Sequence, residues 1–213
     1  MAALTRQWGV SAGSAAARSL IRGIDARLRC KMGIFEFNSD RRCMFRASIG
    51  RVAAPFFVPE SVAAPGAKML VLHLRSERVP PLPAGGPDLM YAKYLTRMAT
   101  DSFRMLAEYL LRDPQAADVA VIGGLTNIFF SGNIQAGKRI FSHLGMGITA
   151  HRSANGAVSR FFTNLYAWMM MWTYNPYVLR ARRPLEIDWY AFWIGRDALV
   201  ARFAPDAARE RTS

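Results

Sequence analysis

One stretch of the chain constrains its fold more than any other: a short apolar run, a proline-rich loop and a long amphipathic segment in direct succession. Met69–Leu74 is almost entirely apolar, as expected of a strand covered on both faces of a sheet. Pro80–Pro87 can neither continue a sheet nor enter a helix interior. Asp88 is then a suitable N-cap for a helix predicted over Leu89–Arg112, which is apolar along one face. A central strand followed by a long helix is therefore expected at the centre of the fold.

The rest of the chain repeats this alternation of strands and helices. A length of 213 residues is sufficient for one full core. Parallel strands joined by helices make right-handed crossovers, so we predict an α/β (α+β) fold: one domain with a central mixed sheet flanked by helices, and amphipathic helices near both ends. Residues 1–29 are expected to form a basic amphipathic extension, 30–204 the domain, and 205–213 a disordered tail. Further strands are expected at Phe45–Gly50, Pro55–Val58, Ala117–Leu125, Met146–Ala150 and Glu186–Ile194, and further helices at Ser19–Arg29, between Asn133 and Gly145, and at Ala198–Phe203.

The charge of the chain favours an anionic partner. Its 28 lysines and arginines exceed its 15 aspartates and glutamates, which gives a formal net charge of +13. Such a field attracts nucleic acids, anionic lipid headgroups or phosphorylated small molecules. The alternative is that an Arg-, Ala- and Pro-rich composition reflects a coding sequence rich in G and C. The sequence has no helix-turn-helix, zinc-finger or ribonucleoprotein motif, so no specific nucleic acid partner is expected.

A second unusual stretch, Phe161–Leu179, contains no charged residue and is rich in Trp, Tyr and Met. Its length approaches the roughly 20 residues of a membrane span, but Asn164, Asn175 and Pro176 argue against a span. Two interpretations remain: a helix at a membrane surface, which the Trp and Tyr content favours, or an aromatic helix of the core. Under the first interpretation the membrane-contacting residues are Trp168, Trp172, Arg180, Arg182 and Arg183.

The predicted N-terminal helix leaves the same two alternatives open. In Ser19–Arg29 the apolar residues recur at helical spacing, and the arginines lie mostly on the other side. Such a basic amphipathic helix lies on a membrane or packs on its own domain. Arg6, Arg18 and Arg22 interrupt any apolar run here, so no secretory signal is predicted.

A dense polar cluster follows the central strand. Strand alternation would place His73, Arg75 and Glu77 on one face. His73 and Glu77 are the candidate catalytic pair, as general base and acid over which a substrate would sit. The candidate ligand-binding residues are Arg75, Ser76, Arg78, Asn127, Lys138 and Arg139.

Each of these candidates also has a structural interpretation. Arg75 or Arg78 would neutralise Glu77 in an ion-pair cluster at the strand end. Lys138 and Arg139 would lie on the solvated face of a short helix. Both interpretations remain open at the level of the sequence.

Other residue types exclude some kinds of chemistry. The three histidines lie far apart, and Cys30 and Cys43 form no CxxC pair, so no metal site is predicted. The two cysteines are expected as free intracellular thiols, with one disulfide as the alternative. Gly123-Gly124, at the end of a predicted strand, would let a ligand approach the backbone closely. No nucleophile elbow, phosphate-binding P-loop or paired-carboxylate spacing is found.

The longer of two resemblances covers roughly Ile24 to Phe203. It rests on the run Leu72–Pro83 with Gly86–Asp88, on the strand Phe45–Gly50, on the junctions Asp113-Pro114 and Ala117–Val119, and on the closing Arg196-Asp197. In these features the chain resembles the YkoP-like domain family, which occurs alone or beside polysaccharide-deacetylase domains and envelope glycosyltransferases. The resemblance implies cell-envelope surroundings and no particular activity.

A shorter resemblance rests on Asn133–Met146 and on the strand–helix–strand–helix–strand order from Met69 to Ala150. In these features the chain is similar to acyl-CoA N-acyltransferases of the GNAT type, which implies a GNAT-like fold and, for an enzyme, acyl-CoA as the cofactor. Those enzymes hold the CoA pyrophosphate on backbone N–H groups of a Gly-rich loop before the long helix. Here prolines remove those donors, and only Gly85 and Gly86 remain to contribute.

Together these features predict a cytoplasmic protein, peripheral to the inner membrane, that acts in bacterial cell-envelope lipid or glycan metabolism. Its expected partners are an anionic membrane surface and a phosphate- or sugar-bearing ligand or lipid. No cofactor is expected under this interpretation. Two alternatives remain: a GNAT-like acyltransferase that uses acyl-CoA, and a non-catalytic scaffold for an envelope deacetylase or glycosyltransferase.

Overall fold

The computed structural model describes residues 12–52, 56–58, 61–83, 85–127, 134–151, 156–181 and 187–204. The predicted tail, Asn133, Arg182 and Arg183 therefore lie outside the described residues. In chain order the elements are α1 (Ala12–Lys31), β1 (Phe45–Arg51), β2 (Phe56–Val58), β3 (Ser61–Ala63), β4 (Lys68–Leu74), α2 (Leu89–Arg112), η1 (Pro114–Ala116), β5 (Val119–Thr126), α3 (Ile134–His143), β6 (Gly147–Ala150), α4 (Gly156–Tyr174), η2 (Pro176–Ala181), β7 (Tyr190–Gly195) and α5 (Arg196–Phe203).

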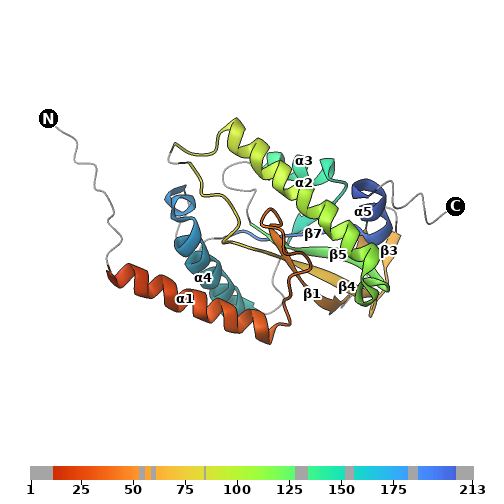
Figure 1. Ribbon diagram of the computed structural model, residues 1–213, viewed down its shortest axis with the longest axis horizontal. Coiled ribbons are helices and arrows are strands. Elements are labelled where there is room, and N and C mark those ends of the chain that lie inside the picture. The colour runs from red at the N-terminus through yellow and green to blue at the C-terminus, as the bar shows by residue number, and fades with distance from the viewer. Residues whose placement is uncertain are drawn as a thin grey trace.

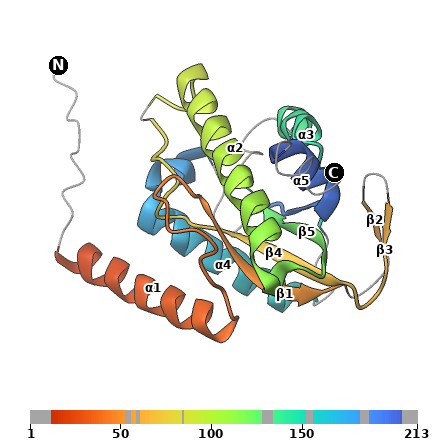
Figure 2. The same ribbon diagram turned by 45° about the vertical axis from the view of Figure 1, so that its right-hand side comes forward.

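A five-stranded mixed sheet forms the centre of the molecule, in the order β1-β4-β5-β7-β6 (Figure 1). Only β4 and β5 run parallel; the other neighbouring pairs are antiparallel. β2 and β3 form a separate hairpin that projects from one end of the sheet (Figure 2). The predicted α/β class, with a mixed sheet flanked by helices, is confirmed.

The long helix α2 has the predicted bounds because its two ends are capped locally. The Asp88 side chain accepts a hydrogen bond from the Tyr91 backbone N–H at 2.7 Å, as an N-cap should. At the other end the Asp113 backbone N–H donates to the Tyr109 carbonyl, and the Asp113 side chain accepts from the backbone N–H of Gln115. The chain therefore leaves α2 directly into η1.

One face of the sheet carries the apolar core. Leu70 and Leu72 of β4 and Ile122 of β5 are buried there against α2, whose Phe103, Leu106 and Leu110 face inward, and α3 and α5 cover the same face (Figure 1). Each fully buried side chain of this kind contributes about 1.5–3 kcal/mol relative to an exposed one. This layer therefore supplies most of the hydrophobic stabilisation.

The opposite face is covered by α4, with α1 packed on α4 (Figures 1 and 2). Apart from Ser102 on α2, the buried polar or charged residues of the described chain belong to this second face or to the helices and loops beside it. They are Asp25, Arg46, Ser48, Arg75, Asn164, Thr173 and Asn175. The sheet thus has one apolar face and a second face on which buried polar residues lie beside a small apolar cluster of Val52, Ala63 and Val121.

Helix α1 has an unexpected orientation. Its less exposed side is mixed: Asp25 is buried and Arg18, Ile21 and Arg29 are half-buried. The apolar side chains of Leu20, Ile24 and Leu28, and of Met32 directly after the helix, are exposed, Leu20 to 66% and Met32 to 57%. The helix packs on its own domain, one of the two predicted alternatives, through the side that carries Asp25, so this apolar stripe faces outward.

The last strand is shorter at its start than predicted. It begins at Tyr190, and its buried side chains are Tyr190, Phe192 and Ile194. The reason is that Phe192 and Ile194 belong to the apolar core. β7 also inserts between β5 and β6, because its antiparallel pairing extends to both neighbours.

None of the described helices combines the length and the apolar character needed to cross a bilayer. This includes α4, which contains most of the uncharged aromatic segment.

Candidate functional site

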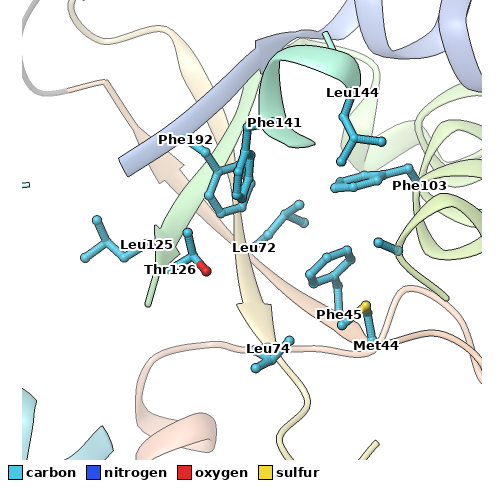
Figure 3. Close-up of a pocket in the computed structure, with 11 residues that line it drawn as sticks. Met44, Phe45, Leu72, Leu74, Phe103, Leu125, Thr126, Phe141, Leu144 and Phe192 are labelled. Atoms are coloured by element: carbon cyan, nitrogen blue, oxygen red, sulfur yellow. The ribbon is translucent and has the colours of Figure 1, made fainter. Parts of the chain in front are cut away.

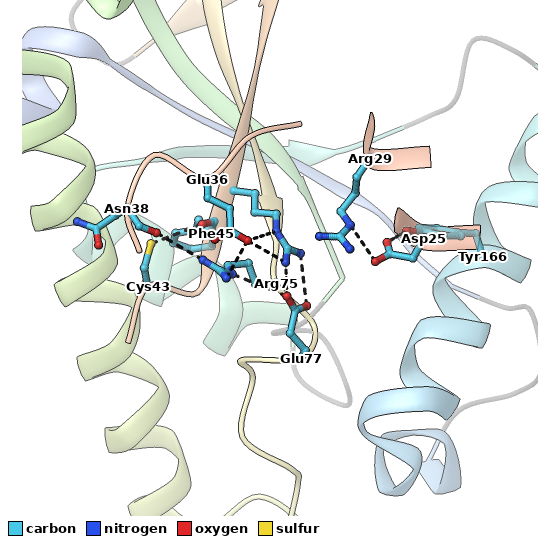
Figure 4. Close-up of polar contacts among 10 residues, drawn as sticks. Asp25, Arg29, Glu36, Asn38, Cys43, Phe45, Arg75, Glu77 and Tyr166 are labelled. Atoms are coloured by element: carbon cyan, nitrogen blue, oxygen red, sulfur yellow. Dashed lines mark hydrogen bonds and ion pairs between the residues drawn. The ribbon is translucent and has the colours of Figure 1, made fainter. Parts of the chain in front are cut away.

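Charged and hydrogen-bonding side chains form two neighbouring groups on the second face of the sheet, one around Arg75 and Glu77 and one between α1 and α4 around Asp25 (Figure 4). We call this cluster the polar layer and define it by Asp25, Arg29, Glu36, Arg46, Ser48, His73, Arg75, Glu77 and Tyr166. Three of these residues, His73, Arg75 and Glu77, were predicted from the sequence. The structure gives them partners from β1, namely Ser48 and Arg46, and from the loop between α1 and β1, namely Glu36.

Arg46 lies between two carboxylates. From β1 it places its Nε and Nη2 atoms each 3.2 Å from Glu36 Oε1. Its other side donates to Glu77, through Nη1 to Oε2 at 3.4 Å and through Nη2 to Oε1 in a closer contact. The Arg46 side chain is nearly fully buried, and the two carboxylates compensate the buried charges of Arg46 and of Arg75, which contacts both of them.

Arg75 follows β4 and joins the same network. Its Nη2 lies 2.9 Å from Glu36 Oε1, and its Nη1 donates to the Asn38 carbonyl at 3.5 Å. Its Nε lies 3.8 Å from Glu77 Oε1 and has no hydrogen-bond partner among the described residues. Its backbone N–H donates to the Met44 carbonyl at 2.8 Å, which fixes where the side chain starts.

The network determines the charge of Glu77. Burial alone would raise the pKa of this carboxyl, but a backbone hydrogen bond and the Arg46 and Arg75 guanidinium groups outweigh burial and hold its pKa below the ordinary value. Glu77 is therefore ionised at neutral pH and engaged by Arg46. This geometry corresponds to the structural interpretation of the cluster: Arg75 pairs with Glu77 at 3.8 Å, and Arg46, which was not predicted, is the closer partner.

His73 makes a different contact. Its Nε2 lies 2.8 Å from the hydroxyl Oγ of Ser48, on the neighbouring strand β1. Burial lowers the pKa of His73, so the imidazole is neutral at pH 7. A neutral imidazole bonded to a hydroxyl has the composition of a base–nucleophile pair. The same bond also satisfies two polar groups on a covered sheet face.

α1 is attached to α4 by polar contacts. Asp25 is buried; its carboxylate accepts the Tyr166 hydroxyl at 2.5 Å and pairs with Arg29 at 3.0 Å. Burial, and then the hydrogen bond to Asp25, raise the pKa of Tyr166 well above its usual value. Arg18 of α1 lies over the Trp172 ring at 5.2 Å. The contact between the helices is thus made by charges and aromatic rings.

The other predicted ligand-binding residues are dispersed. Ser76 and Arg78 lie in the turn after β4, where the Arg78 backbone N–H donates to the Arg75 carbonyl. Asn127 follows β5. Lys138 and Arg139 are exposed on α3, on the opposite side of the sheet, and border a shallow open depression. The structure does not bring Lys138 and Arg139 to the polar layer.

The predicted membrane-contacting residues also have defined places. Trp168 and Trp172 are half-buried on α4, and Trp172 lies beneath Arg18. Arg180 lies over the Tyr177 ring at 4.4 Å in η2. The exposed apolar side chains of α4 are instead at its start, at Val158, Phe161 and Phe162.

An apolar cavity of about 40 Å³ lies on the first face of the sheet (Figure 3). Phe45, Phe103, Phe141 and Phe192 surround it, and the exposed Leu74 and Leu125 form its rim. The cavity lies where the parallel strands separate: their register ends at Leu72↔Gly124, although β4 and β5 continue for two more residues each.

The structure does not support the predicted approach of a ligand to Gly123-Gly124. A Cβ atom on Gly123 would lie 2.6 Å from the Phe192 carbonyl oxygen, and one on Gly124 would lie 2.6 Å from the Leu72 carbonyl oxygen. These glycines leave room for neighbouring strands, and that space is filled by the protein itself.

Six members of the polar layer were not predicted as site residues: Asp25, Arg29, Glu36, Arg46, Ser48 and Tyr166. Arg46 gave a usable signal, because strand alternation over Phe45–Gly50 places it on one face with Ser48. Asp25 is the first acidic residue of the chain and interrupts a run of arginines. Neither signal identifies the partner, because Arg46 and Glu77 are 31 positions apart and Asp25 and Tyr166 are 141 apart.

Comparison with known proteins gives no relative: no family model, no curated protein and no solved structure matches this chain. Within the described residues, no three His, Cys, Asp or Glu side chains group as they would around a metal ion. Cys30 is exposed on α1, Cys43 is buried before β1, and both are free thiols.

Proposed function

We propose that this protein is a membrane-peripheral domain that docks on an anionic membrane surface and acts in bacterial cell-envelope lipid or glycan metabolism. The observation that carries the proposal is the outward apolar stripe of α1: Leu20, Ile24, Leu28 and Met32. In a helix packed on its own domain, these side chains would be expected to face the core. Here the side of α1 that packs on the domain carries the buried Asp25, and the four apolar side chains of the stripe are exposed.

The surroundings of the stripe fit an anionic membrane. Arg27 and Lys31 are exposed and lie one turn from stripe residues, so cations border the apolar side chains. Amphipathic helices of this composition bury their apolar side chains at the acyl boundary and place cations among the headgroups. The net charge of +13 adds long-range attraction to anionic lipid.

The start of α4 extends this surface. Contacts of Asp25 with Tyr166 and of Arg18 with Trp172 show that α1 and α4 run antiparallel, so α4 begins beside the end of α1 (Figure 1). Phe161 and Phe162 are exposed there. Aromatic side chains at such a position suit the membrane interface.

The polar layer lies directly beneath the docked helices. It supplies arginines, a Ser48–His73 pair and half-exposed carboxylates within reach of a sugar- or phosphate-bearing ligand at a membrane surface. The envelope context of the proposal is supported by the resemblance to YkoP-like domains. The cytoplasmic side of the inner membrane is the proposed location.

Vesicle co-sedimentation tests the proposal. A variant with Leu20, Ile24 and Leu28 changed to Ser is expected to lose most binding to vesicles that contain phosphatidylglycerol, with unchanged folding by circular dichroism. The matched control changes Leu89 and Met90, which are 74% and 73% exposed at the start of α2, to Ser. Failure of the wild-type protein to bind at low salt, or equal binding by both variants, would refute the proposal.

A second candidate function is an acyl-CoA-dependent acyltransferase, and the apolar cavity is the observation that favours it. The space between the separating ends of β4 and β5 opens at Leu74 and Leu125 and is lined by aromatic rings. Its volume of about 40 Å³ fits a short acyl group better than a long chain. The resemblance to GNAT-type enzymes supports the same candidate.

Calorimetric titration separates the two candidates. An acyltransferase of this kind is expected to release heat with acetyl-CoA, and Leu125→Trp at the rim should abolish that heat by blocking the cavity. Ile49→Trp, at a similarly exposed position on β1, is the control. No heat with acetyl-CoA or a long-chain acyl-CoA at millimolar concentration would eliminate this candidate.

A further inference from the structure

We infer that Arg46 and Arg75 form a binding site for a phosphate group, and that Glu36 occupies this site in the absence of the ligand. The inference rests on the proposed function, since it names the chemistry of the anionic ligand that the polar layer would hold. It adds Arg46 as a ligand-binding residue and Glu36 as an internal competitor. The ligand class is a phosphate monoester or inorganic phosphate.

The contacts of Glu36 resemble those of a bound oxyanion. A single oxygen, Oε1, lies within 3.2 Å of three guanidinium nitrogen atoms: two from Arg46 and one from Arg75. Two arginines converging on one oxygen atom are the geometry that proteins use for phosphate and carboxylate ligands.

Exposure differs sharply between the two sides of this contact. The side chains of Arg46 and Arg75 are 7% and 4% exposed, whereas that of Glu36 is 45% exposed. The cations are therefore fixed in the interior, and the carboxylate reaches them from the solvent side. A group that binds from solvent would meet both guanidinium groups at the place where Glu36 now lies.

Glu36 can leave by rotating its side chain alone. The neighbouring backbone is fixed, because Phe35 and Ala47 exchange hydrogen bonds of 2.8 and 3.0 Å. No strand has to separate for the exchange. The exposed glutamate side chain gains solvent and rotamer freedom when it is displaced.

Glu36 leaves part of the donor capacity of the site unused. Arg75 Nε is buried and lacks a hydrogen-bond partner among the described residues. Glu77 Oε1 lies 3.8 Å from this nitrogen, which is beyond hydrogen-bond distance, so a further acceptor oxygen beside Arg75 would satisfy this donor. A phosphate group offers more acceptor oxygens than the single Glu36 oxygen that the arginines now share.

The charge balance agrees with this assignment. Glu77 is less exposed than Glu36 and holds Arg46 from the other side, so it stays in place when a ligand enters. With Glu36 displaced, two guanidinium groups and one carboxylate leave a net charge of +1 on these three side chains. That charge suits an entering anion and excludes a cationic or neutral one.

Titration of the full-length protein with inorganic phosphate tests the inference. Glu36→Gln removes the competing charge while keeping the side-chain shape. We expect it to tighten phosphate binding about tenfold, the equivalent of one charge-assisted hydrogen bond. The matched control is Glu108→Gln, which removes a carboxylate of similar exposure that pairs with Arg112 on α2. It changes the net charge equally and should leave phosphate binding unchanged.

A second set of measurements identifies the source of the phosphate. If the ligand is a lipid headgroup, Glu36→Gln also binds more tightly to vesicles with phosphatidic acid than to vesicles of equal charge with phosphatidylserine. If the ligand is soluble, the gain is confined to inorganic phosphate. Either pattern supports the site.

Equal phosphate affinities for the wild-type, Glu36→Gln and Glu108→Gln proteins would overturn the inference. So would an equal gain in both variants, because net charge alone would then explain it. Arg75→Lys, which keeps the charge but loses the fork of donors, should reverse the gain of Glu36→Gln. Membrane docking is measured separately through the α1 variants, so its failure and the failure of this site are distinguishable.

Discussion

At the scale of single residues, Gly124 is a position where the sheet leaves no room for a side chain. A Cβ atom there would lie 2.6 Å from the Leu72 carbonyl oxygen and 3.1 Å from the Phe192 ring. The first of these neighbours is backbone and cannot move without disturbing the β4–β5 pair. We expect Gly124→Ala to lower the free energy of unfolding by about 2–3 kcal/mol, measured by urea denaturation.

Gly23→Ala is the control for this prediction. Gly23 lies within α1, and nothing is found within 4 Å of the position a Cβ would take. Alanine should therefore be neutral or stabilise the helix by up to about 1 kcal/mol. Equal effects of the two substitutions would contradict the steric argument.

Tyr166 gives a pH-dependent prediction. Burial and its hydrogen bond to Asp25 raise the pKa of Tyr166 above the ordinary value of about 10. Below pH 10 both folded and unfolded states carry the proton, and the stabilisation is complete. Above about pH 10 the unfolded state releases its proton first, so stability declines as pH rises. Tyr166→Phe should make that decline shallower in urea denaturation between about pH 9 and 11.

The same variant has an effect at neutral pH. Loss of the hydroxyl removes a hydrogen bond to a charged, buried carboxylate, and we expect a cost of about 1.5 kcal/mol. If the wild-type and Tyr166→Phe curves run parallel through the alkaline range, the contribution of Tyr166 to the pH dependence is refuted.

What could be predicted at this scale depended on sequence separation. Asp88 was recognised as the cap of α2 because its partner, Tyr91, is three positions away and the geometry of a helix start is fixed. His73, Arg75 and Glu77 were recognised as a cluster for the same reason. The carboxylate that pairs with Arg75 and the arginine that pairs with Glu77 come from other segments, and no local rule selects them.

At the scale of elements, α1 makes a testable contrast. Because its apolar stripe is exposed, Leu20→Ser should change the free energy of unfolding by less than about 0.5 kcal/mol. Asp25→Asn should lower it by about 2 kcal/mol or more, because the substitution removes the charge that pairs with Arg29 in a buried site. Denaturant unfolding of the two variants measures both values.

A larger loss for Leu20→Ser than for Asp25→Asn would show that α1 packs through its apolar side. In the usual amphipathic pattern of a helix packed on its own domain, the apolar residues face the core. The sequence pattern identifies the two sides of the helix but not which side the domain covers, because that choice depends on the polar surface of α4.

Helix α2 and strand β7 show the limits of prediction for elements. The bounds of α2 follow from caps and a steady 3.6-residue period, both of which are local. The position of β7 between β5 and β6 depends on pairing with residues far earlier in the chain. Val121 pairs with Gly195 and Ile148 pairs with Phe192, at separations of 74 and 44 residues. Strand order is set by such pairings and is not encoded in periodicity.

At the scale of the whole molecule, the excess of positive charge predicts how membrane binding depends on salt. Between about 0.1 M and 1 M salt the Debye length falls from roughly 10 Å to 3 Å, so attraction of a +13 protein to anionic lipid is largely screened. We expect most vesicle binding to be lost over this range in co-sedimentation. The fraction of binding that remains at high salt should depend on the α1 stripe. Binding that does not change with salt would contradict this prediction.

The two faces of the sheet also differ in how far sequence could describe them. The apolar face follows from patterning, since Leu70 and Leu72 alternate along β4 and α2 presents a continuous apolar side. The polar face assembles from single residues of five segments, each unremarkable in its own sequence context. The fold class was therefore predictable, whereas the partners within the polar layer required the three-dimensional arrangement.

The polar attachment of α1 has a consequence for orientation on a bilayer. A helix held by apolar contacts can exchange them for lipid tails at little loss, because the acyl region is as apolar as a protein core. A helix held by Asp25, Arg29 and Tyr166 has no such substitute in lipid, and its contacts strengthen as water is excluded. The domain would therefore keep one fixed tilt against the membrane, with the polar layer at a constant depth below the headgroups.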